Sequence, residues 1–276
     1  MEINWFPGHM AKSMREIDDN LSRADCVLYV LDSRAVRSCF NPVFDEMIKI
    51  PVVYVLNKAD TVTDDVVNGW LDKLRSKGNI AVSVEGTNAS ACRKRVLSAI
   101  KTACAAVIER QKRRGLNEHL RAMVVGVPNT GKSTIINSLC NKSRLTTGDK
   151  AGVTRAALWA RVDGTLDILD TPGTLYPKIT DRRVGENLAI VGSIKDEVLD
   201  VSELAVALID RLNAADPAIL RQRFGDVVCS YEGLEVIAKK RGYLQRGGVA
   251  DTERAAAAVI DDYRKGRLGK IALEKV

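Results

Sequence analysis

The stretch Gly126-Val127-Pro128-Asn129-Thr130-Gly131-Lys132-Ser133 decides the fold of this chain. It matches the pattern of a phosphate-binding loop, in which glycines let backbone N–H groups curl around phosphate oxygens. The apolar run 123–127 leads into it, and an amphipathic segment begins at Lys132, so the loop joins a buried strand to a helix. The sequence therefore predicts a helix whose positive N-terminal end faces a bound phosphate.

The side chains of this loop have distinct predicted roles. Lys132 is expected to reach the β- and γ-phosphates of a nucleotide, and the Ser133 hydroxyl is expected to bind Mg²⁺. The other nucleotide-binding residues predicted in or next to the loop are Asn129, Thr130, Gly131 and Thr134.

Around the loop, short apolar runs alternate with helical stretches through the first two thirds of the chain. This alternation predicts an α/β domain with a mostly parallel sheet and helices on both faces. The Asp163-Gly164 turn predicts a hairpin that adds one antiparallel strand. The expected strands are 26–31, 52–56, 80–84, 123–127, 158–162 and 166–169, and the expected helices lie near 11–23, 64–77 and 88–118.

The strand pattern ends near residue 180. Beyond it, residues 201–212 and 252–263 show helical spacing, with Leu204, Leu208 and Leu212 on one face. We therefore expect a nucleotide-binding domain over residues 1–178 and a small all-helical C-terminal domain over residues 179–276.

A second motif, Asn57-Lys58-Ala59-Asp60, follows the predicted strand 52–56 and selects the base. The Asp60 carboxylate can accept hydrogen bonds from N1–H and the exocyclic amine of guanine. Adenine lacks this pair of donors and would leave the carboxylate desolvated and unsatisfied. Asn57 is expected to hold the loops together and the Lys58 stem to cover the base, while Ser83 is expected to contact the base from the next loop. The motif thus predicts GTP rather than ATP.

A third motif, Asp170-Thr171-Pro172-Gly173, ends the predicted strand 166–169. Asp170 is expected to hold Mg²⁺ through a water, and the Gly173 N–H is expected to sense the γ-phosphate. Thr154 is the predicted second hydroxyl ligand of Mg²⁺, because it lies between the phosphate-loop helix and the next strand, as a first switch does. A solvated Thr154, with Thr146 or Thr147 as the ligand, is the alternative.

The order of these motifs is unusual. The base motif begins at residue 57 and the phosphate loop at residue 126, whereas in ordinary small GTPases the phosphate loop comes first. All the motifs belong on loops at the carboxyl edge of one parallel sheet, so joining the strands in a different order leaves that edge intact. The order therefore predicts a circularly permuted P-loop GTPase.

The composition indicates which partners and which cellular compartment are compatible with the chain. The formal net charge is +7, and residues 111–180 hold 11 Lys and Arg against 5 Asp and Glu. This excess indicates either an anionic partner such as RNA or a solvated basic surface. Six scattered cysteines, no apolar run near the roughly 20 residues of a membrane span, and no secretory signal predict a cytoplasmic protein with reduced thiols.

The motif order, the opening Trp5-Phe6-Pro7-Gly8-His9-Met10 and the late segment from Lys239-Lys240-Arg241 to Gly247-Gly248 resemble the ribosome biogenesis GTPase A family over nearly the whole chain. The resemblance implies a GTP-hydrolysing assembly factor that binds a precursor of the large ribosomal subunit and leaves on GTP hydrolysis. It also implies rRNA contact through the helical domain and a K⁺ ion bound by Asn129. From the residues themselves, 239–241 and 264–270 form either an RNA contact or a solvated basic face.

The sequence also departs from the usual GTPase pattern. Thr174 follows the third motif where such families usually have a hydrophobic residue, and no glutamine stands there to orient the attacking water. His9 is the predicted catalytic residue, because an antiparallel return from the first helix to strand 26–31 places it near the carboxyl edge of the sheet, and imidazole titrates near neutrality. A His9 that packs on Trp5 or caps the helix is the alternative.

Two rival functions fit the same motifs. One is a GTP-binding scaffold that does not hydrolyse the nucleotide. The other is a translation or tRNA-modification GTPase that uses the same site on another RNA. The oligomeric state has no signature in the sequence.

Overall fold

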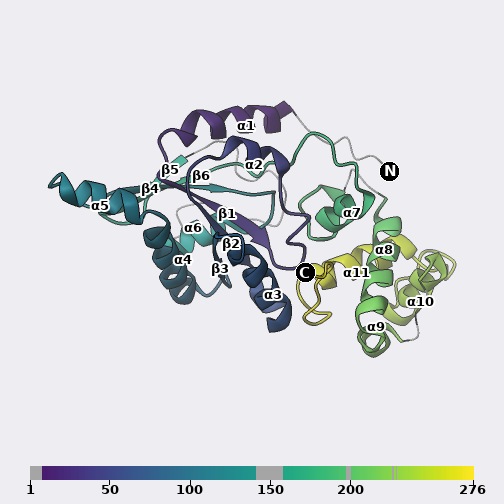
Figure 1. Ribbon diagram of the computed structural model, residues 1–276. Coiled ribbons are helices and arrows are strands. Elements are labelled where there is room, and N and C mark those ends of the chain that lie inside the picture. Colours follow the sequence, from purple (N-terminus) through teal and green to yellow (C-terminus); the bar gives the residue numbers. More distant parts are fainter. Residues whose placement is uncertain (1–7, 141–157, 197–199, 226, 228) are drawn as a thin grey trace.

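A six-stranded sheet forms the centre of the molecule in the computed structural model, which describes residues 8–140, 158–196, 200–225, 227 and 229–276 (Figure 1). The strand order is β3-β2-β1-β4-β6-β5. Neighbouring strands are parallel except for β5 and β6, which form the predicted antiparallel hairpin. The strands are β1 (Cys26–Asp32), β2 (Val52–Asn57), β3 (Ile80–Ser83), β4 (Leu120–Val125), β5 (Leu158–Arg161) and β6 (Leu166–Asp170).

The strand order reverses between β1 and β4. From β1 the chain builds outward through β2 and β3, and it then returns to the other side of β1 with β4. In register, Asp32 of β1 lies beside Asn57 of β2, and Leu28 of β1 lies beside Val124 of β4. Loops that leave the carboxyl ends of strands at such a point diverge and leave a crevice. The phosphate loop after β4 and the base motif after β2 therefore share one edge, as the sequence predicted.

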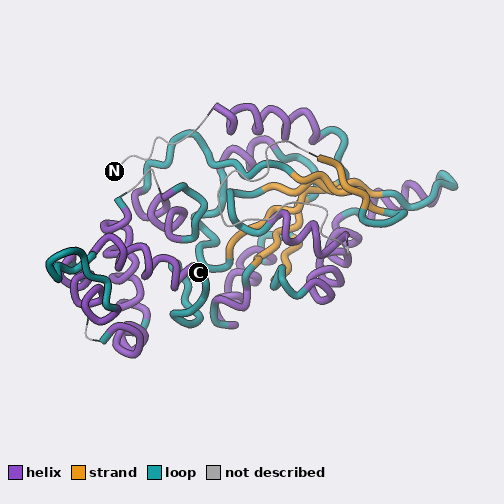
Figure 2. The backbone as a smooth tube through the Cα atoms, turned by 180° about the vertical axis from the view of Figure 1, so that it is seen from behind, coloured by secondary structure: helices purple, strands orange, loops and turns teal. Residues whose placement is uncertain are grey.

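Helices cover both faces of the sheet (Figure 2). Val27, Tyr29 and Leu31 of β1 pack with helices α1, α2 and α3, while the alternate residues of the strand pack with α4 and α6. This alternation is the period of two that a strand buried on both faces requires. These helices are α1 (Gly8–Leu21), α2 (Pro42–Met47), α3 (Asp64–Arg75), α4 (Ala89–Ala103), α5 (Ala105–Arg113) and α6 (Lys132–Cys140).

The segment 88–118 was expected to be one helix, and the structure corrects this to two. The break lies at Cys104, which caps α4, precedes α5 and is fully buried. Neither glycine nor proline marks the break, so the apolar pattern of the sequence continues across it without interruption.

The helical part comprises α7 (Arg182–Ile190), α8 (Val201–Ala215), α9 (Pro217–Phe224), α10 (Tyr231–Arg241) and α11 (Thr252–Arg264). Aspartate side chains cap the first backbone N–H groups of α7, α8, α9 and α11. Leu204, Leu208 and Leu212 of α8 are buried, as their spacing predicted. Within the described residues, no helix is both long and apolar enough to cross a membrane.

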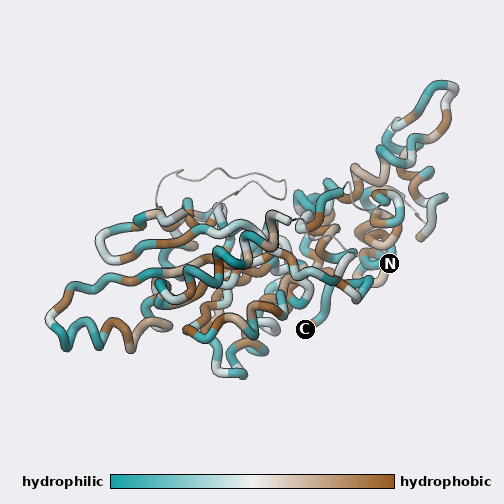
Figure 3. The backbone as a smooth tube through the Cα atoms, turned by 90° about the horizontal axis from the view of Figure 1, so that it is seen from above, coloured by the Kyte–Doolittle hydropathy of each residue, from teal (hydrophilic) through white to brown (hydrophobic). Residues whose placement is uncertain are grey.

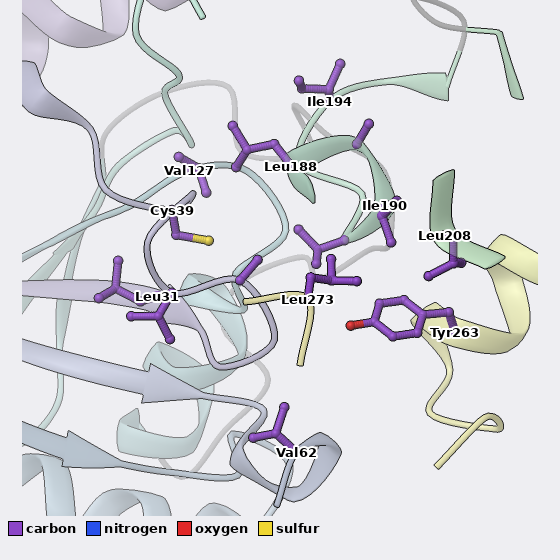
Figure 4. Close-up of a cluster of buried hydrophobic side chains, with 14 of the residues drawn as sticks. Leu31, Cys39, Val62, Val127, Leu188, Ile190, Ile194, Leu208, Tyr263 and Leu273 are labelled. Carbon is purple, nitrogen blue, oxygen red and sulfur yellow. The ribbon is translucent and has the colours of Figure 1, made fainter. Parts of the chain in front are cut away.

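One buried hydrophobic cluster connects the sheet with the helical part (Figure 4). Leu31 of β1, Leu188 of α7, Leu208 of α8 and Tyr263 of α11 all belong to it. Leu273 joins them from the tail after α11, which returns to the sheet part. Figures 1 and 3 accordingly place the C-terminus at the junction between the two parts.

Candidate nucleotide site

The phosphate loop has the backbone that its sequence requires. Gly126, Asn129 and Gly131 adopt positive φ angles of 148°, 61° and 91°. A Cβ at Gly126 would lie 2.4 Å from the Val30 carbonyl oxygen of β1, so only glycine fits this approach. Thr130 is fully buried, and its hydroxyl donates to the Val127 carbonyl at 3.1 Å. A loop with this backbone at the start of α6 is suited to bind an anion.

Lys132 begins α6 and lies folded into the loop. The residue is 7% exposed, and its Nζ donates to the carbonyls of Gly126 at 3.0 Å and Val127 at 2.9 Å. Burial lowers the pKa of Lys132 to about 8, against the opposing effect of the nearby Asp170 carboxylate. The ammonium group is therefore held at the phosphate loop without an ion partner at hydrogen-bond distance among the described residues.

Two side chains with oxygen donors lie beside Lys132. The Ser133 hydroxyl donates to Asp170 Oδ2 at 3.0 Å, which joins the start of α6 to the end of β6. A hydroxyl and a carboxylate next to a phosphate site are the hard oxygen donors that suit Mg²⁺, which takes its remaining ligands from phosphates and water. The donor chemistry therefore fits this ion. Thr154, the predicted second hydroxyl ligand, and its alternatives Thr146 and Thr147 lie outside the described residues.

Gly173 packs directly on the phosphate loop. A Cβ there would lie 2.6 Å from Pro128 Cα and 2.9 Å from Lys132 Nζ. The next residue, Thr174, is fully buried, and its backbone N–H donates to the Gly126 carbonyl at 3.3 Å. The segment after β6 thus rests against the loop, where its backbone can respond to the outermost phosphate.

Asn57 connects three loops, as the sequence predicted. Its Nδ2 donates to the Thr130 carbonyl at 2.7 Å, and its Oδ1 accepts from the Gly86 N–H at 2.9 Å. A Cβ at Gly131 would lie 2.1 Å from Asn57 Nδ2, so the phosphate loop needs glycine at this contact. The phosphate loop, the base motif and the loop after β3 are therefore held as one unit.

The rest of the base motif follows in a tight turn. Lys58 adopts a left-handed φ of 57°, and Asp60 lies exposed in the 3₁₀ turn Ala59–Thr61. Lys58 Nζ donates to the Asn129 carbonyl at 2.8 Å, so its stem crosses from the base motif to the phosphate loop. Ser83 ends β3, and its carbonyl accepts from Arg95 at 3.0 Å.

Known proteins match this chain over almost all of its length. A family model described as 50S ribosome-binding GTPase matches residues 121–228. A ribosome biogenesis GTPase A from Bacillus cereus is 37% identical over 282 residues, which cover 99% of this chain and 94% of that protein. The chain belongs to the ribosome biogenesis GTPase A family. A family protein from Thermotoga maritima is 30% identical over 275 residues, with 99% of this chain and 94% of that protein covered.

Solved structures agree with this family membership. GNP-bound YlqF from T. maritima matches with a TM-score of 0.66 and 26% identity, and the match covers 96% of this chain and 98% of that chain. The GDP-bound structure of the same protein gives a TM-score of 0.66 and 28% identity over 95% of this chain and 99% of that chain. The predicted fold, a circularly permuted P-loop GTPase domain with a helical C-terminal region, is confirmed, and the protein is a GTPase.

In this GTPase, the phosphate loop also contacts the helical part. Asn129 Nδ2 donates to the Gly192 carbonyl after α7 at 2.6 Å, and the Ser193 hydroxyl donates to the Pro128 carbonyl at 2.7 Å. The same turn is bound from the other side by Arg264, whose guanidinium donates to the carbonyls of Ala189 and Ile190. No sequence motif indicates these contacts, because they join residues more than 60 positions apart.

Asp32 and Arg34 at the end of β1 also belong to the site, although none of the predicted motifs includes them. Both are buried, and Asp32 forms ion pairs with Arg34 at 2.7 Å and with Lys58 at 2.9 Å. Burial by itself would raise the pKa of Asp32, but the two cations hold it well below its ordinary value. The sequence does contain an indication that Asp32 and Arg34 belong to the site. They are charged residues at the end of a buried strand, at the edge of the sheet that carries the other motifs.

The two histidines lie at different edges of the sheet. His9 belongs to the first turn of α1, and its side chain lies outside the described structure. The start of α1 is on the side of the sheet where the parallel strands end (Figure 1). His119 precedes β4 at the opposite edge, where its Nε2 lies 3.1 Å from Asp167 Oδ2. His119 is thus placed for a structural contact with Asp167, remote from the phosphate loop.

Proposed function

We propose that this GTPase is an assembly factor for the large ribosomal subunit, which it binds as a precursor through rRNA and leaves on GTP hydrolysis. The observation that carries this proposal is the similarity to ribosome biogenesis GTPase A proteins, which spans both the sheet part and the helical part. We take residues 1–178 as the nucleotide domain and 179–276 as the part that contacts the ribosomal particle. A factor with this role works in the cytoplasm.

The experiment that tests this function is GTP turnover with and without large ribosomal subunits, together with sedimentation on their precursors. Stimulated turnover and GTP-dependent sedimentation with large-subunit precursors are expected. Binding without turnover would instead support the scaffold, and sedimentation with tRNA alone would support a tRNA-modification GTPase.

The site residues divide the nucleotide among them in this proposal. Asn57, Lys58, Asp60 and Ser83 take the guanine side. Asn129, Thr130, Gly131, Lys132, Ser133 and Thr134 surround the phosphates, and Gly173 responds to the γ-phosphate through its N–H. Ser133 and Thr154, with Asp170 acting through a water, would hold Mg²⁺, which would supply positive charge next to the phosphates. Apart from Mg²⁺ and the K⁺ ion expected at Asn129, the contributions come from side chains and N–H groups of the chain itself.

The basic residues of the helical part differ in how available they are for RNA. Arg241 pairs with Asp262 at 2.6 Å, and Arg264 pairs with Asp196. Lys239, Lys240 and Lys270 are exposed, and Lys239 also pairs with Glu235 at 3.6 Å. We therefore assign rRNA contact to these lysines, since phosphate contacts need accessible cations.

Replacing Asp60 by asparagine should shift the nucleotide preference from GTP toward xanthosine triphosphate. The 2-oxo group of xanthine needs a donor where the guanine amine needs an acceptor. Hydrogen bonds to a charged group contribute about 1.5–3 kcal/mol, so GTP affinity should fall about 10- to 100-fold. Competition binding with GTP, xanthosine triphosphate and ATP measures the change. An unchanged preference for GTP would remove Asp60 from the base site.

Potassium should accelerate GTP hydrolysis more than sodium. A monovalent cation at Asn129 would supply charge next to the phosphates, and Arg34 cannot act as an arginine finger because it is buried against Asp32. The Asn129→Ala variant should lose the difference between the two salts. Ser193→Ala removes the neighbouring hydrogen bond to the Pro128 carbonyl and should retain the difference between potassium and sodium. Equal wild-type rates in both salts would contradict a potassium site.

A further inference from the structure

A buried ion cluster at the end of β1 holds the base motif. Asp32 accepts from Arg34 Nε at 2.9 Å and from Arg34 Nη2 at 2.7 Å, while Lys58 Nζ lies 2.9 Å from Asp32 Oδ2. Asp32 is fully buried, and Arg34 is 2% exposed. Paired, charge-assisted hydrogen bonds of this kind fix geometry tightly. The position of Lys58 therefore depends on a carboxylate whose other partner is Arg34.

Arg34 is held in turn by α11. Its guanidinium carbon lies 5.4 Å from the centre of the Tyr263 ring, and its Nη1 donates to the Arg264 carbonyl at 3.2 Å. Arg34 and Arg264 lie 230 positions apart in the sequence. The buried guanidinium thus has two sets of partners, one in the nucleotide site and one in the helical part.

The tail after α11 contacts the turn of the base motif directly. The Ile271 N–H donates to the carbonyl of Thr61, the last residue of the turn that carries Asp60, at 3.1 Å. The Leu273 N–H donates to the Arg34 carbonyl at 2.8 Å, and the Tyr263 hydroxyl donates to the Ile271 carbonyl at 2.9 Å. The tail therefore joins α11, Arg34 and the base motif through main-chain contacts.

Glu274 fixes the tail in this place. Its carboxylate accepts from the backbone N–H groups of Arg37 and Ser38, from the Ser38 hydroxyl and from Asn187 of α7. In Figure 4, Leu273 lies between the strand residue Leu31 and Tyr263 of α11. Burying charges costs desolvation energy that an apolar cluster would avoid, so the ion cluster is poorly explained as a source of stability alone.

We propose that α11 and the C-terminal tail position the guanine-reading turn Asn57–Thr61, with Asp32, Arg34 and Glu274 as positioning residues. This inference rests on the proposed role of that turn in reading guanine. By linkage, a ligand that displaces α11 or the tail weakens guanine-nucleotide binding, and bound nucleotide opposes that displacement by the same factor.

Arg34→Met tests the proposal, with Arg37→Met as the matched control. Arg37 is exposed in the same loop and undergoes the same chemical change. Contacts to the base are equal in the ground state and the transition state, so their loss raises KM and leaves kcat unchanged. We expect a KM for GTP raised about 10-fold or more, near-wild-type kcat, and weaker discrimination against ATP. A KM and a discrimination equal to those of Arg37→Met would overturn the proposal.

A double-mutant cycle shows whether Arg34 acts through Lys58. In a Lys58→Met background, Arg34→Met should raise the GDP dissociation constant much less than it does alone, because the two residues share Asp32. Additive effects would reject this route. A fall in kcat at unchanged KM would also reject it, since that result places the coupling at the phosphates.

Glu274→Ala, with Lys275→Ala as its control, decides the proposal if Arg34→Met does not fold. Glu274→Ala leaves the ion cluster intact but releases the tail, and it should raise KM in the same way. Thermal destabilisation with a wild-type KM would show that the tail stabilises the fold but does not position the base motif. Asp60→Asn, measured in parallel, distinguishes failure of this proposal from failure of the base-site assignment. If Asp60→Asn leaves the nucleotide preference unchanged, the base-site assignment itself has failed.

Discussion

Replacing His9 by alanine is expected to lower GTP turnover about 10²–10⁴-fold, the usual contribution of a positioned general acid or base. GTP affinity should hardly change, because His9 would act on water or the γ-phosphate only in the transition state. Single-turnover hydrolysis and equilibrium GTP binding, both with ribosomal subunits present, measure the two quantities. The variant should remain GTP-bound and stay on its ribosomal precursor.

His119→Ala is the matched control for this experiment. His119 is the other histidine of the chain, and it pairs with Asp167 at the edge of the sheet opposite the phosphate loop. Its removal should therefore leave turnover intact. Wild-type turnover in His9→Ala would return His9 to a packing or capping role, and so would joint loss of affinity and thermal stability. Only lost turnover with retained binding supports catalysis.

The placement of α1 is what makes His9 a candidate. Met10, the next residue, is 2% exposed and packs in the core on the α1 face of the sheet. This contact fixes the start of α1 on the side where the parallel strands end (Figure 1). The third motif supplies no glutamine, and its Thr174 is buried against the phosphate loop. Another group must therefore orient the attacking water, and His9 is the predicted one.

The nucleotide site was predictable from the sequence because its motifs are local. The phosphate loop needs glycine at Gly126 and Gly131, where a Cβ would meet Val30 or Asn57, so the residue types reveal the geometry. Asn57 was predicted to hold the loops together, and its two hydrogen bonds confirm that role. Strands buried on both faces also show continuous apolar runs that are visible without a structure.

Several short helices escaped the apolar periodicity. Helix α2 has 6 residues and α9 has 8, too few to show a repeated apolar face. Their starts were nevertheless marked, because Asn41-Pro42 and Asp216-Pro217 each place a capping side chain before a proline. Capping signals therefore carried information that periodicity did not.

The contacts between the two parts could not be predicted from the sequence. Arg34 reads as an ordinary surface arginine until the structure shows it buried between Asp32 and Tyr263. Residues 271–276 follow the last helix and resemble an unattached end, yet Leu273 and Glu274 bind the loop after β1. No local pattern encodes a pairing over 230 positions, because its energy arises only after both parts have folded.

Replacing Lys132 by alanine should lower activity without lowering the stability of the fold. Loss of the charge that stabilises the transferring phosphoryl group should lower kcat/KM about 10²–10³-fold. Burial holds the pKa of Lys132 near 8, below its ordinary 10.5, so the folded protein binds fewer protons than the unfolded chain between these values. Stability therefore rises with pH across that window, and below pH 8 the charged lysine destabilises the fold.

Lys132→Ala, measured at neutral pH without nucleotide or Mg²⁺, should consequently unfold at the same or a higher temperature than the wild type. Lys112→Ala, on the exposed end of α5, controls for loss of a surface lysine and should change neither quantity. Calorimetric melting and GTP turnover give the two readouts. Wild-type turnover in Lys132→Ala would contradict the phosphate-loop assignment, whereas lost turnover with a lower melting temperature would show that Lys132 supports the fold. A lysine kept at a cost to stability is what a site built for an incoming phosphate requires.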